Sequence, residues 1–419
     1  MPKHQLFKLP NFRSQVWILA GGRLLSQIGT GFTLFYAPIF FVNQVGLSAT
    51  LVGIALGSGS LSGTVGRFLG GQWSDSPQWG RRRTLLISAA VSAVADVALA
   101  LTYNFPTLVI GNLLMGLGVG LYWPATEAAI VDLTTIEQRN EAFAITRLAD
   151  SLGLGLGVVL GGAFIAAEGN YRLLFVMDGI SFVIFFALIY ALIPETYQFG
   201  QSSSKTIKGW SIAWRDRALM VYVIVNILFT TYLSQVQSTL PLYLNNFVPA
   251  AGAGTGFSEQ TISALFSWHI AFAAISQLPV ARWLNRFSRI QALSFSLLFW
   301  GIGFVLIWLT GVTATYPLIW AVAALGVLAI AMVSYTPSAS ALVADLAPES
   351  LRGIYLSINS QCWAIGYLIG PPIGGWALDR SAGVARGFWL VAAISIGVGI
   401  LVLRYLGKVL ATRSGNVKP

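Results

Sequence analysis

Twelve long, mostly apolar stretches dominate this 419-residue chain. Each is long enough to cross a hydrocarbon core of roughly 30 Å as an α-helix, which requires about 20 residues. The expected spans are 15–42, 49–73, 84–103, 106–130, 141–167, 172–193, 217–246, 259–284, 290–311, 316–343, 353–378 and 384–407. The sequence therefore predicts an all-α membrane protein with twelve transmembrane helices.

The composition excludes several classes of protein. Charged residues make up only 10% of the chain, whereas soluble domains carry about 25%. Most soluble enzymes, DNA-binding modules and disordered regulators are therefore excluded. The single cysteine, Cys362, excludes an intramolecular disulfide, and His4 and His269 are too few for a histidine metal site. With no nucleotide loop or nucleophile–base pair, we expect neither an enzyme, nor a cofactor, nor a bound metal.

The distribution of basic residues predicts the orientation. With the N-terminus placed in the cytoplasm, nineteen Lys and Arg residues fall in cytoplasmic segments, and only Arg172, Arg380 and Arg386 fall outside. Because cytoplasmic loops of membrane proteins are enriched in Lys and Arg, both termini are expected in the cytoplasm. This bias also explains the net charge of +10 without a nucleic-acid partner.

The chain contains an internal repeat. Residues 122–162 align without gaps on 335–375, and eleven positions are identical, among them Tyr122 with Tyr335 and Asp132 with Asp345. The longest polar stretch separates six spans from six. Because six is even, the two copies share one orientation and form a parallel repeat. We therefore expect an N-terminal six-helix bundle at 1–194, a cytoplasmic linker at 195–216 and a C-terminal bundle at 217–419.

Both repeats carry a glycine series at four-residue spacing. Gly153 and Gly157 belong to the first, and Gly366 and Gly370 to the second. Small residues on one helix face allow neighbouring backbones to approach closely. The face then serves tight packing, with sliding or rocking as a functional addition. Pro371, which Pro372 follows, is expected to bend its helix, since proline removes a backbone donor.

Several segments resemble motifs of the major facilitator superfamily. The series Gly71-Gln72-Trp73-Ser74-Asp75 followed by Gly80-Arg81-Arg82-Arg83 is similar to the signature loop between its second and third helices. The spacing departs from the family pattern, with four residues between Asp75 and Gly80 instead of two. Gly366-x3-Gly370-Pro371 is similar to the antiporter motif, but it lies in the eleventh span rather than the fifth. Asn112 stands where the family carries an arginine.

The resemblance covers the whole chain and is greatest to bacterial twelve-helix drug:proton antiporters. It implies a gate at the cytoplasmic ends of the second to fourth spans. In such a gate Asp75, Arg81 and Asp132, with Arg139, form a charge relay that also caps the N-terminus of the span at 353–378. Ordinary basic loop charge is the alternative interpretation. An aspartate beside a helix N-terminus is electrostatically favourable.

Six ionisable residues inside the spans are candidates for proton coupling or substrate binding, because buried charge in a membrane is costly. Arg147 and Asp150, three residues apart, can pair on one helix face. Burial favours the protonated form of a carboxyl group, and Asp150 ranks first for proton coupling. All six lie in the first half of the chain: Arg23, Asp96, Glu127, Arg147, Asp150 and Asp178.

The second half offers aromatic and amide side chains instead. A cavity with one acidic and one aromatic side suits amphipathic or cationic substrates, through charge and cation–π contacts. Lipid-facing or packing roles are the alternative for each aromatic residue. The substrate-cavity candidates are Asn226, Tyr232, Gln235, Asn359, Gln361 and Trp363.

Together these features predict a monomeric inner-membrane transporter that works by alternating access. Its expected partners are the lipid bilayer, a small-molecule substrate and protons. Export of small amphipathic compounds in exchange for protons is the first hypothesis. A carrier or uniporter for a sugar or organic anion, with Arg23 binding the anion, and a transport-dead sensor on the same fold are the alternatives.

Overall fold

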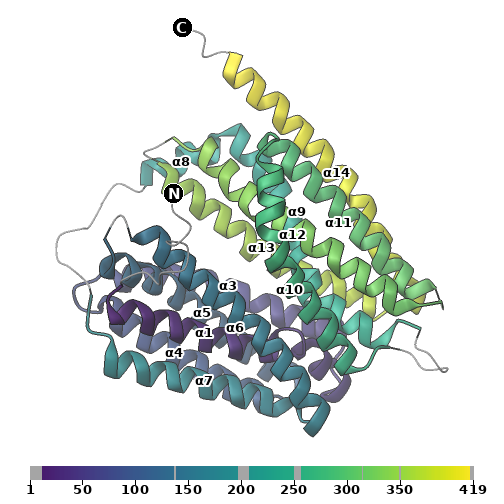
Figure 1. Ribbon diagram of the computed structural model, residues 1–419, viewed down its shortest axis with the longest axis horizontal. Coiled ribbons are helices and arrows are strands. Elements are labelled where there is room, and N and C mark those ends of the chain that lie inside the picture. Colours follow the sequence, from purple (N-terminus) through teal and green to yellow (C-terminus); the bar gives the residue numbers. More distant parts are fainter. Residues whose placement is uncertain are drawn as a thin grey trace, which may run out of the picture.

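A computed structural model describes residues 12–135, 138–196, 207–249, 256–313, 315–348 and 351–415. The described chain is helical throughout its regular structure (Figure 1). The elements are α1 Ser14–Leu34, α2 Ala37–Ile39, the π-helix η2 Phe40–Gln44, α3 Ala49–Ser74, α4 Gly80–Ala100, α5 Phe105–Leu133, α6 Arg139–Glu168, α7 Tyr171–Leu192, α8 Ile207–Arg215, α9 Arg217–Asn246, α10 Glu259–Leu284, α11 Arg289–Val312, α12 Pro317–Leu346, α13 Arg352–Leu378 and α14 Ala382–Gly415.

Short polar side chains set the starts of several helices. The Ser48 side chain accepts a hydrogen bond from the Leu51 amide at α3, and Asp216 accepts one from Ala218 at α9. Asn104 and Ser288 form reciprocal capping boxes at α5 and α11. These caps satisfy backbone amides that have no partner within the helix. A left-handed glycine, Gly169, ends α6, as is common at helix C-termini.

The twelve-helix prediction is confirmed, with small differences. Eleven helices in the described part of the chain are long and apolar enough to cross a membrane. The helix α13 is not one of these eleven, although it spans 27 residues. The first span is interrupted after α1 and continues through α2 and η2. The nine-residue α8 was not predicted; it lies in the expected linker, of which 197–206 falls outside the described residues.

The two halves repeat the same helix packing. In the first half α1 packs on α6 and α7, α3 packs on α5, and α4 packs on α5 and α7. In the second half α9 packs on α13 and α14, α10 packs on α12, and α11 packs on α12 and α14. Each of these contacts in one half thus has its counterpart six spans later, which confirms the parallel repeat.

The halves meet through two equivalent pairs, α3 with α13 and α6 with α10. Figure 1 shows the two groups of ribbons converging at one end and separating at the other, where α8 lies. We call the second end, at which α3 ends and α9 begins, the linker end. The opposite end, at which α3 begins and α13 ends, is the closed end.

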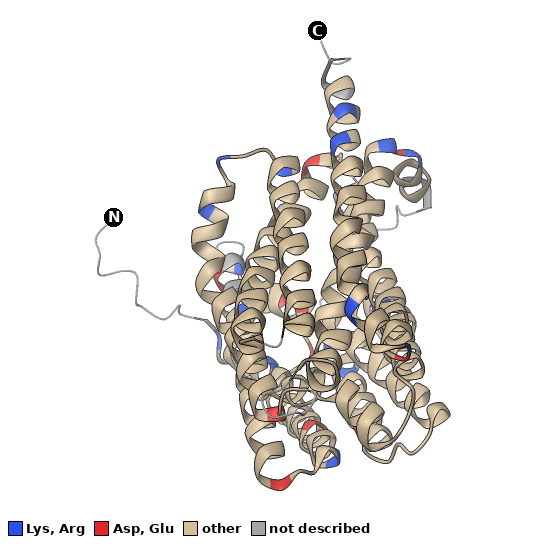
Figure 2. Cartoon of the chain, turned by 90° about the vertical axis from the view of Figure 1, so that its right-hand side faces the viewer, with Lys and Arg blue, Asp and Glu red and all other residues tan. Residues whose placement is uncertain are grey.

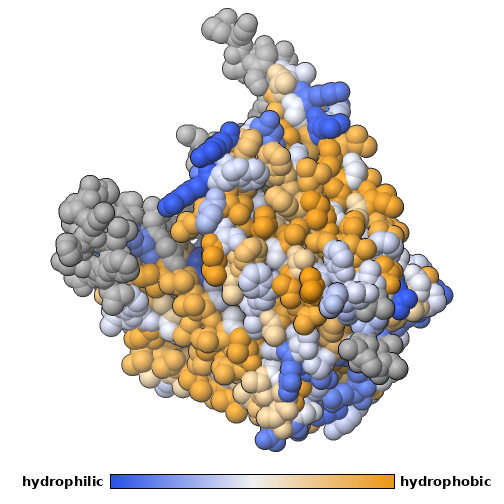
Figure 3. All heavy atoms as spheres, turned by 45° about the vertical axis from the view of Figure 1, so that its right-hand side comes forward, coloured by the Kyte–Doolittle hydropathy of each residue, from blue (hydrophilic) through white to orange (hydrophobic). Residues whose placement is uncertain are grey.

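The outer surface is broadly apolar. Phe68, Ile275 and Ile394 are among many large apolar side chains that are exposed, and Figure 3 shows orange surface over much of the helices, with blue patches toward their ends. Figure 2 shows long uncharged stretches of helix. Such a surface fits contact with lipid, where apolar side chains are not penalised.

Candidate functional site

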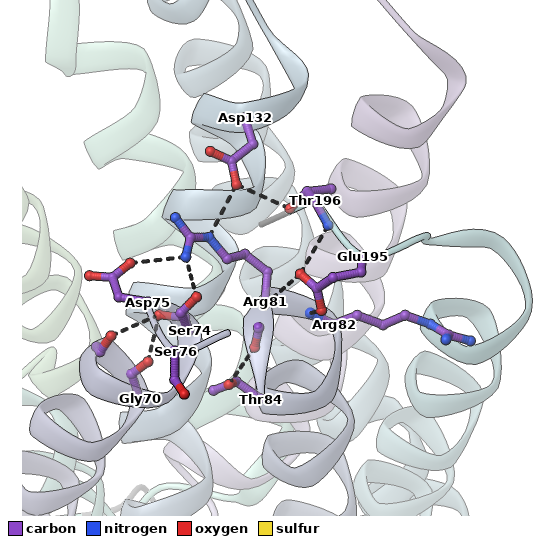
Figure 4. Close-up of polar contacts among 12 residues, drawn as sticks. Gly70, Ser74, Asp75, Ser76, Arg81, Arg82, Thr84, Asp132, Glu195 and Thr196 are labelled. Carbon is purple, nitrogen blue, oxygen red and sulfur yellow. Dashed lines mark hydrogen bonds and ion pairs between the residues drawn. The ribbon is translucent and has the colours of Figure 1, made fainter. Parts of the chain in front are cut away.

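Arg81 organises a charge cluster at the linker end. Its Nε atom lies 3.1 Å from Asp132 Oδ2, and its Nη1 atom lies 2.9 Å from Asp75 Oδ1. Nη1 also donates to the backbone carbonyl of Ser74. Figure 4 shows the guanidinium between the two carboxylates. The cluster therefore ties the end of α3 to the start of α4 and the end of α5.

A fourth element reaches this cluster from beyond α7. Glu195 accepts hydrogen bonds from the backbone amides of Arg81, at 2.8 Å, and Arg82, at 3.2 Å. The hydroxyl of Thr196 donates to Asp132 at 3.2 Å. Glu195 thus sits on the positive N-terminus of α4, where an anion is favoured. Glu195 and Thr196 were not among the residues predicted from the sequence; the available signal was a carboxylate directly after an apolar span.

The structure brings together three of the four expected gate residues. Asp75 and Asp132 both contact Arg81, whereas the buried Nε atom of Arg139 has no hydrogen-bond partner in the described part of the chain. The side chain of Asp75 is 72% exposed. It does not cap α13 in this conformation, because α13 begins without a side-chain cap.

Arg23 and Asp150 form a buried ion pair between α1 and α6. Arg23 Nε lies 2.9 Å from Asp150 Oδ1, and Nη2 binds the second carboxylate oxygen. Arg23 is only 1% exposed, and its guanidinium lies 4.8 Å from the centre of the Trp123 ring. The two charges therefore neutralise each other, and Arg23 has no free face for a substrate anion.

Arg147 has a different partner from the one its spacing suggested. It lies 3.8 Å from Glu127, and both side chains are well exposed. Its guanidinium lies 5.7 Å from the centre of the Trp123 ring. The pairing of Arg147 with Asp150 within α6 was wrong, because Asp150 faces α1 and Arg147 faces α5.

Asp96 and Asp178 lie apart from these pairs: Asp96 of α4 packs on α7, and the carboxylate of Asp178 of α7 lies against Gly29 of α1. Asp96 is fully buried, and neither of its carboxylate oxygens has a hydrogen-bond partner among the described residues. It packs against Gly179, the residue after Asp178. Asp178 Oδ1 accepts a hydrogen bond from Ser181 at 3.4 Å. Neither aspartate lines the cavities described next.

Two cavities lie between the halves. One, of about 860 Å³, is lined by α3, α5, α6, α8 and α13. The other, of about 400 Å³, lies deeper and is lined by α3, α5, α13 and Leu34 at the end of α1. Thr64, Arg67 and Trp363 line both, so the cavities adjoin. Since Arg147 and Glu127 line the larger cavity and are 65% and 47% exposed, water reaches it. The space runs from the linker end toward the middle of the helices.

Two of the six expected substrate-cavity residues, Gln361 and Trp363, line this space. The other four do not line it; their side chains form contacts inside the C-terminal helix bundle. Asn226 and Asn359 share a hydrogen bond of 3.0 Å between α9 and α13. Tyr232 bonds to Ser395 at 2.6 Å, and the Gln235 amide donates to the Gly370 carbonyl at 2.7 Å. These side chains are satisfied within their own helix bundle.

The glycine series also packs within each half. Gly157 of α6 lies against Ile28 and Gly31 of α1, and Gly153 lies against Leu24. In the second half Gly366 and Gly370 of α13 lie against α9, at Thr230 and Ser234. The glycines therefore bring α6 onto α1 and α13 onto α9. The helix α13 continues through Pro371 and Pro372 to Leu378.

Polar and aromatic contacts join the halves at the closed end. Asp379, directly after α13, accepts hydrogen bonds from the Ala49 and Thr50 amides at the start of α3, both at 2.7 Å. Asn43 donates to Asn245 at 2.7 Å. The rings of Phe35 and Phe266 stack with centroids 4.1 Å apart. The conformation is thus closed at this end and open at the linker end.

Comparison with known proteins points to one family. The family model of the Major Facilitator Superfamily matches residues 19–248 and 243–418. The multidrug resistance protein MdtH of Shigella boydii is 26% identical over 381 residues, which is 88% of this chain and 87% of the relative. The MdtH protein of Escherichia coli K12 matches with the same identity and coverage.

Solved structures share the fold at low sequence identity. The nucleoside transporter NupG (D323A mutant) gives a TM-score of 0.79 with 14% identity, covering 93% of this chain and 99% of its own. A peptide transporter POT in complex with alafosfalin gives 0.78 with 16% identity, covering 99% of both chains. A D-xylose-proton symporter gives 0.69 with 19% identity, covering 91% and 96%.

Proposed function

Because the chain belongs to the Major Facilitator Superfamily, we propose that this transporter exports small amphipathic compounds, drugs among them, in exchange for protons. The observation that carries the proposal is the water-accessible cavity between the two halves, lined by both charged and aromatic side chains. The relatives named multidrug resistance proteins, at 26% identity, support the substrate class. The protein acts as a monomer, since one chain contains the whole cavity.

The linker end faces the cytoplasm of a bacterial cell in this proposal, and both termini lie on that side of the inner membrane. The excess of Lys and Arg in the segments at this end supports the orientation. The conformation described above is then open to the cytoplasm, ready to take up a compound for export.

Alternating access requires the closed end to open and the linker end to close. The helices α3 and α13 pack against each other and run in opposite directions. Each is directly followed by an aspartate, Asp75 or Asp379. Asp379 now binds the start of α3. We assign to Asp75 the reciprocal contact with the start of α13 in the outward-open state.

The Arg23–Asp150 pair is suited to couple protons to this movement. A proton on Asp150 removes the charge that holds Arg23, so the link between α1 and α6 weakens. The pair lies next to the cavity, because Trp123 contacts Arg23 and lines the larger cavity. Protonation of Asp150 and the intact Arg23–Asp150 ion pair are thus mutually exclusive. Glu127, which lines the cavity itself, is the second candidate carboxylate.

The test of the proposed function is proton flux in proteoliposomes. With protein reconstituted and a pH-sensitive dye inside, addition of an amphipathic drug should release protons in the direction opposite to drug flux. A strain that expresses the transporter should tolerate several-fold more drug than one with an empty vector. Drug flux without proton movement would contradict the antiport proposal. Flux of nucleosides, peptides or sugars, with no flux of drugs, would favour a metabolite carrier.

We expect Asp75→Asn to abolish transport while expression and ligand binding stay intact. Its side chain is 72% exposed here, so the fold does not depend on its charge. In the present conformation Asp75→Asn loses only an exposed contact with Arg81, which contributes little. The outward-open state would lose the carboxylate at the N-terminus of α13 on which its closed gate depends. Labelling of Ser360→Cys in the cavity reports the open linker end. The labelling should be faster in Asp75→Asn and slower in Asp379→Asn. Full transport by Asp75→Asn would contradict the gate.

A further inference from the structure

The charges that line the cavity do not balance. Among the described residues, the two adjoining cavities are lined by three charged side chains: Arg67, Arg147 and Glu127. Glu127 pairs with Arg147 at 3.8 Å. Arg67 forms no hydrogen bond or ion pair within the described part of the chain, although Glu127 lies near enough to interact with it electrostatically. The lining therefore carries one positive charge in excess.

The remaining carboxylates do not offset this charge. The carboxylate of Asp150 accepts hydrogen bonds from both Nε and Nη2 of Arg23. Asp96 lies between α4 and α7, the carboxylate of Asp178 lies against Gly29 of α1, and neither lines either cavity. The number of carboxylates in the first half suggests an acidic cavity. Once the ion pairs are assigned, the net charge of the cavity lining is positive.

Arg67 lies where a ligand in the cavities would contact it. It lies on α3, seven residues before the helix ends at Ser74, or about 10 Å from the linker end at 1.5 Å per residue. It lines the larger, outer cavity and the smaller, deeper one. Ser60 and Thr64, spaced at helical intervals from Arg67, face the deeper cavity beside it. A compound that moves from the outer cavity into the deeper one passes this side chain.

Flat apolar surface lies next to the free cation. Trp363 lines both cavities, and its ring lies 6.0 Å from that of Tyr367, nearly parallel. Trp123 also lines the outer cavity, but the guanidinium groups of Arg23 and Arg147 already lie over its ring. Trp363 is therefore an aromatic face, shared by both cavities, that is available to a ligand beside Arg67; Trp210 lines the outer cavity as well.

We propose that the substrate carries an anionic group of the carboxylate type, which binds Arg67, and an aromatic or apolar body, which packs against Trp363. This inference rests on the proposed function and names its substrate class. The planar guanidinium donates parallel hydrogen bonds to two oxygen atoms of one anion. Arg67 is exposed to the open cavity, so an anion can reach its guanidinium. A zwitterion with the same carboxylate meets the requirement equally well.

Binding of a matched ligand pair tests the proposal. We would measure the Kd of the full-length protein in nanodiscs for 1-naphthoate and for its neutral amide, 1-naphthamide. The wild type should bind the carboxylate at least about ten-fold more tightly, which corresponds to 1.4 kcal/mol. Arg67→Gln should abolish this preference, and Arg67→Lys should keep part of it. Arg404→Gln, which removes an exposed charge on α14, should leave it unchanged.

The outcomes separate this inference from the proposed function. A carboxylate preference that survives Arg67→Gln, or a wild type that binds both ligands equally, overturns the anion site. If neutral and cationic drugs still drive proton flux in that case, export stands without it. If Arg67→Gln loses the preference but no drug moves protons, the anion site stands and the exporter proposal fails. Size-exclusion profiles identify any variant that does not fold.

Discussion

Replacing Asp150 by asparagine should cost the transporter both its stability and its proton coupling, and a second substitution should restore only the first. Asp150→Asn leaves the guanidinium of Arg23, which is 1% exposed, without its carboxylate. Removing one partner of a buried ion pair typically costs about 3–5 kcal/mol. We therefore expect a lower yield of folded protein, a lower midpoint of thermal aggregation, and drug flux that no longer follows the pH gradient.

The double variant Arg23→Gln with Asp150→Asn should recover the thermal midpoint, because it replaces two charges by two amides. The second half provides a natural example, since Asn226 and Asn359 join α9 to α13 through an amide hydrogen bond of 3.0 Å. Proton coupling should stay lost in the double variant. Asp345→Asn serves as the control, because its pair with Arg289 is exposed and such pairs contribute little. Proton-driven transport by the double variant would exclude Asp150 as the coupling residue.

The second large effect is expected from a single methyl group at the closed end. A Cβ atom on Gly53 of α3 would overlap the carbonyl group of Pro371 in α13, across the contact between the halves. Overpacking of this kind costs about 1–3 kcal/mol. Since Gly53→Ala adds this cost only while the closed end is closed, the ratio of the two states should shift toward outward-open by about 5- to 150-fold.

Distances between spin labels at Tyr103 and Tyr316 measure this shift. Both side chains are 70% exposed, and they precede α5 and α12, the equivalent helices of the two halves. The distance distribution should move to longer values in Gly53→Ala. In Gly21→Ala it should stay as in the wild type, because a Cβ atom there meets nothing within 4 Å. An unchanged distance distribution in Gly53→Ala would show that the contact between α3 and α13 accommodates the added methyl group without opening of the closed end.

The positions of the spans could be predicted because length and apolar content are properties of single segments. The predicted span 217–246 coincides with α9, and 259–284 coincides with α10. The break after α1 was not visible, because Phe35 and Tyr36 are as apolar as their neighbours. The helix α8 was missed because nine amphipathic residues between polar segments carry neither a span pattern nor a clear helix start.

The partners of the buried charges could not be predicted, although the charges themselves were. Spacing along one helix made Arg147 and Asp150 neighbours, but the rotation of α6 against α1 and α5 decides which side each faces. Arg67 lies within the predicted span 49–73 but is not among the six candidates from the sequence. Its signal was the series Ser60, Thr64 and Arg67, which repeats at helical spacing and marks a polar face of an otherwise apolar helix.

The aspartates that follow α3 and α13 have a consequence for reversibility. Asp379 now binds the start of α3, and we assign the equivalent bond from Asp75 to α13 in the opposite state. One carboxylate–amide contact is then exchanged for another of the same chemistry, so this exchange favours neither state. The contacts at the two ends therefore leave both states accessible, and the gradients alone set the direction of transport. Inverting the pH gradient across the membrane would convert the exporter into an importer of the same compounds.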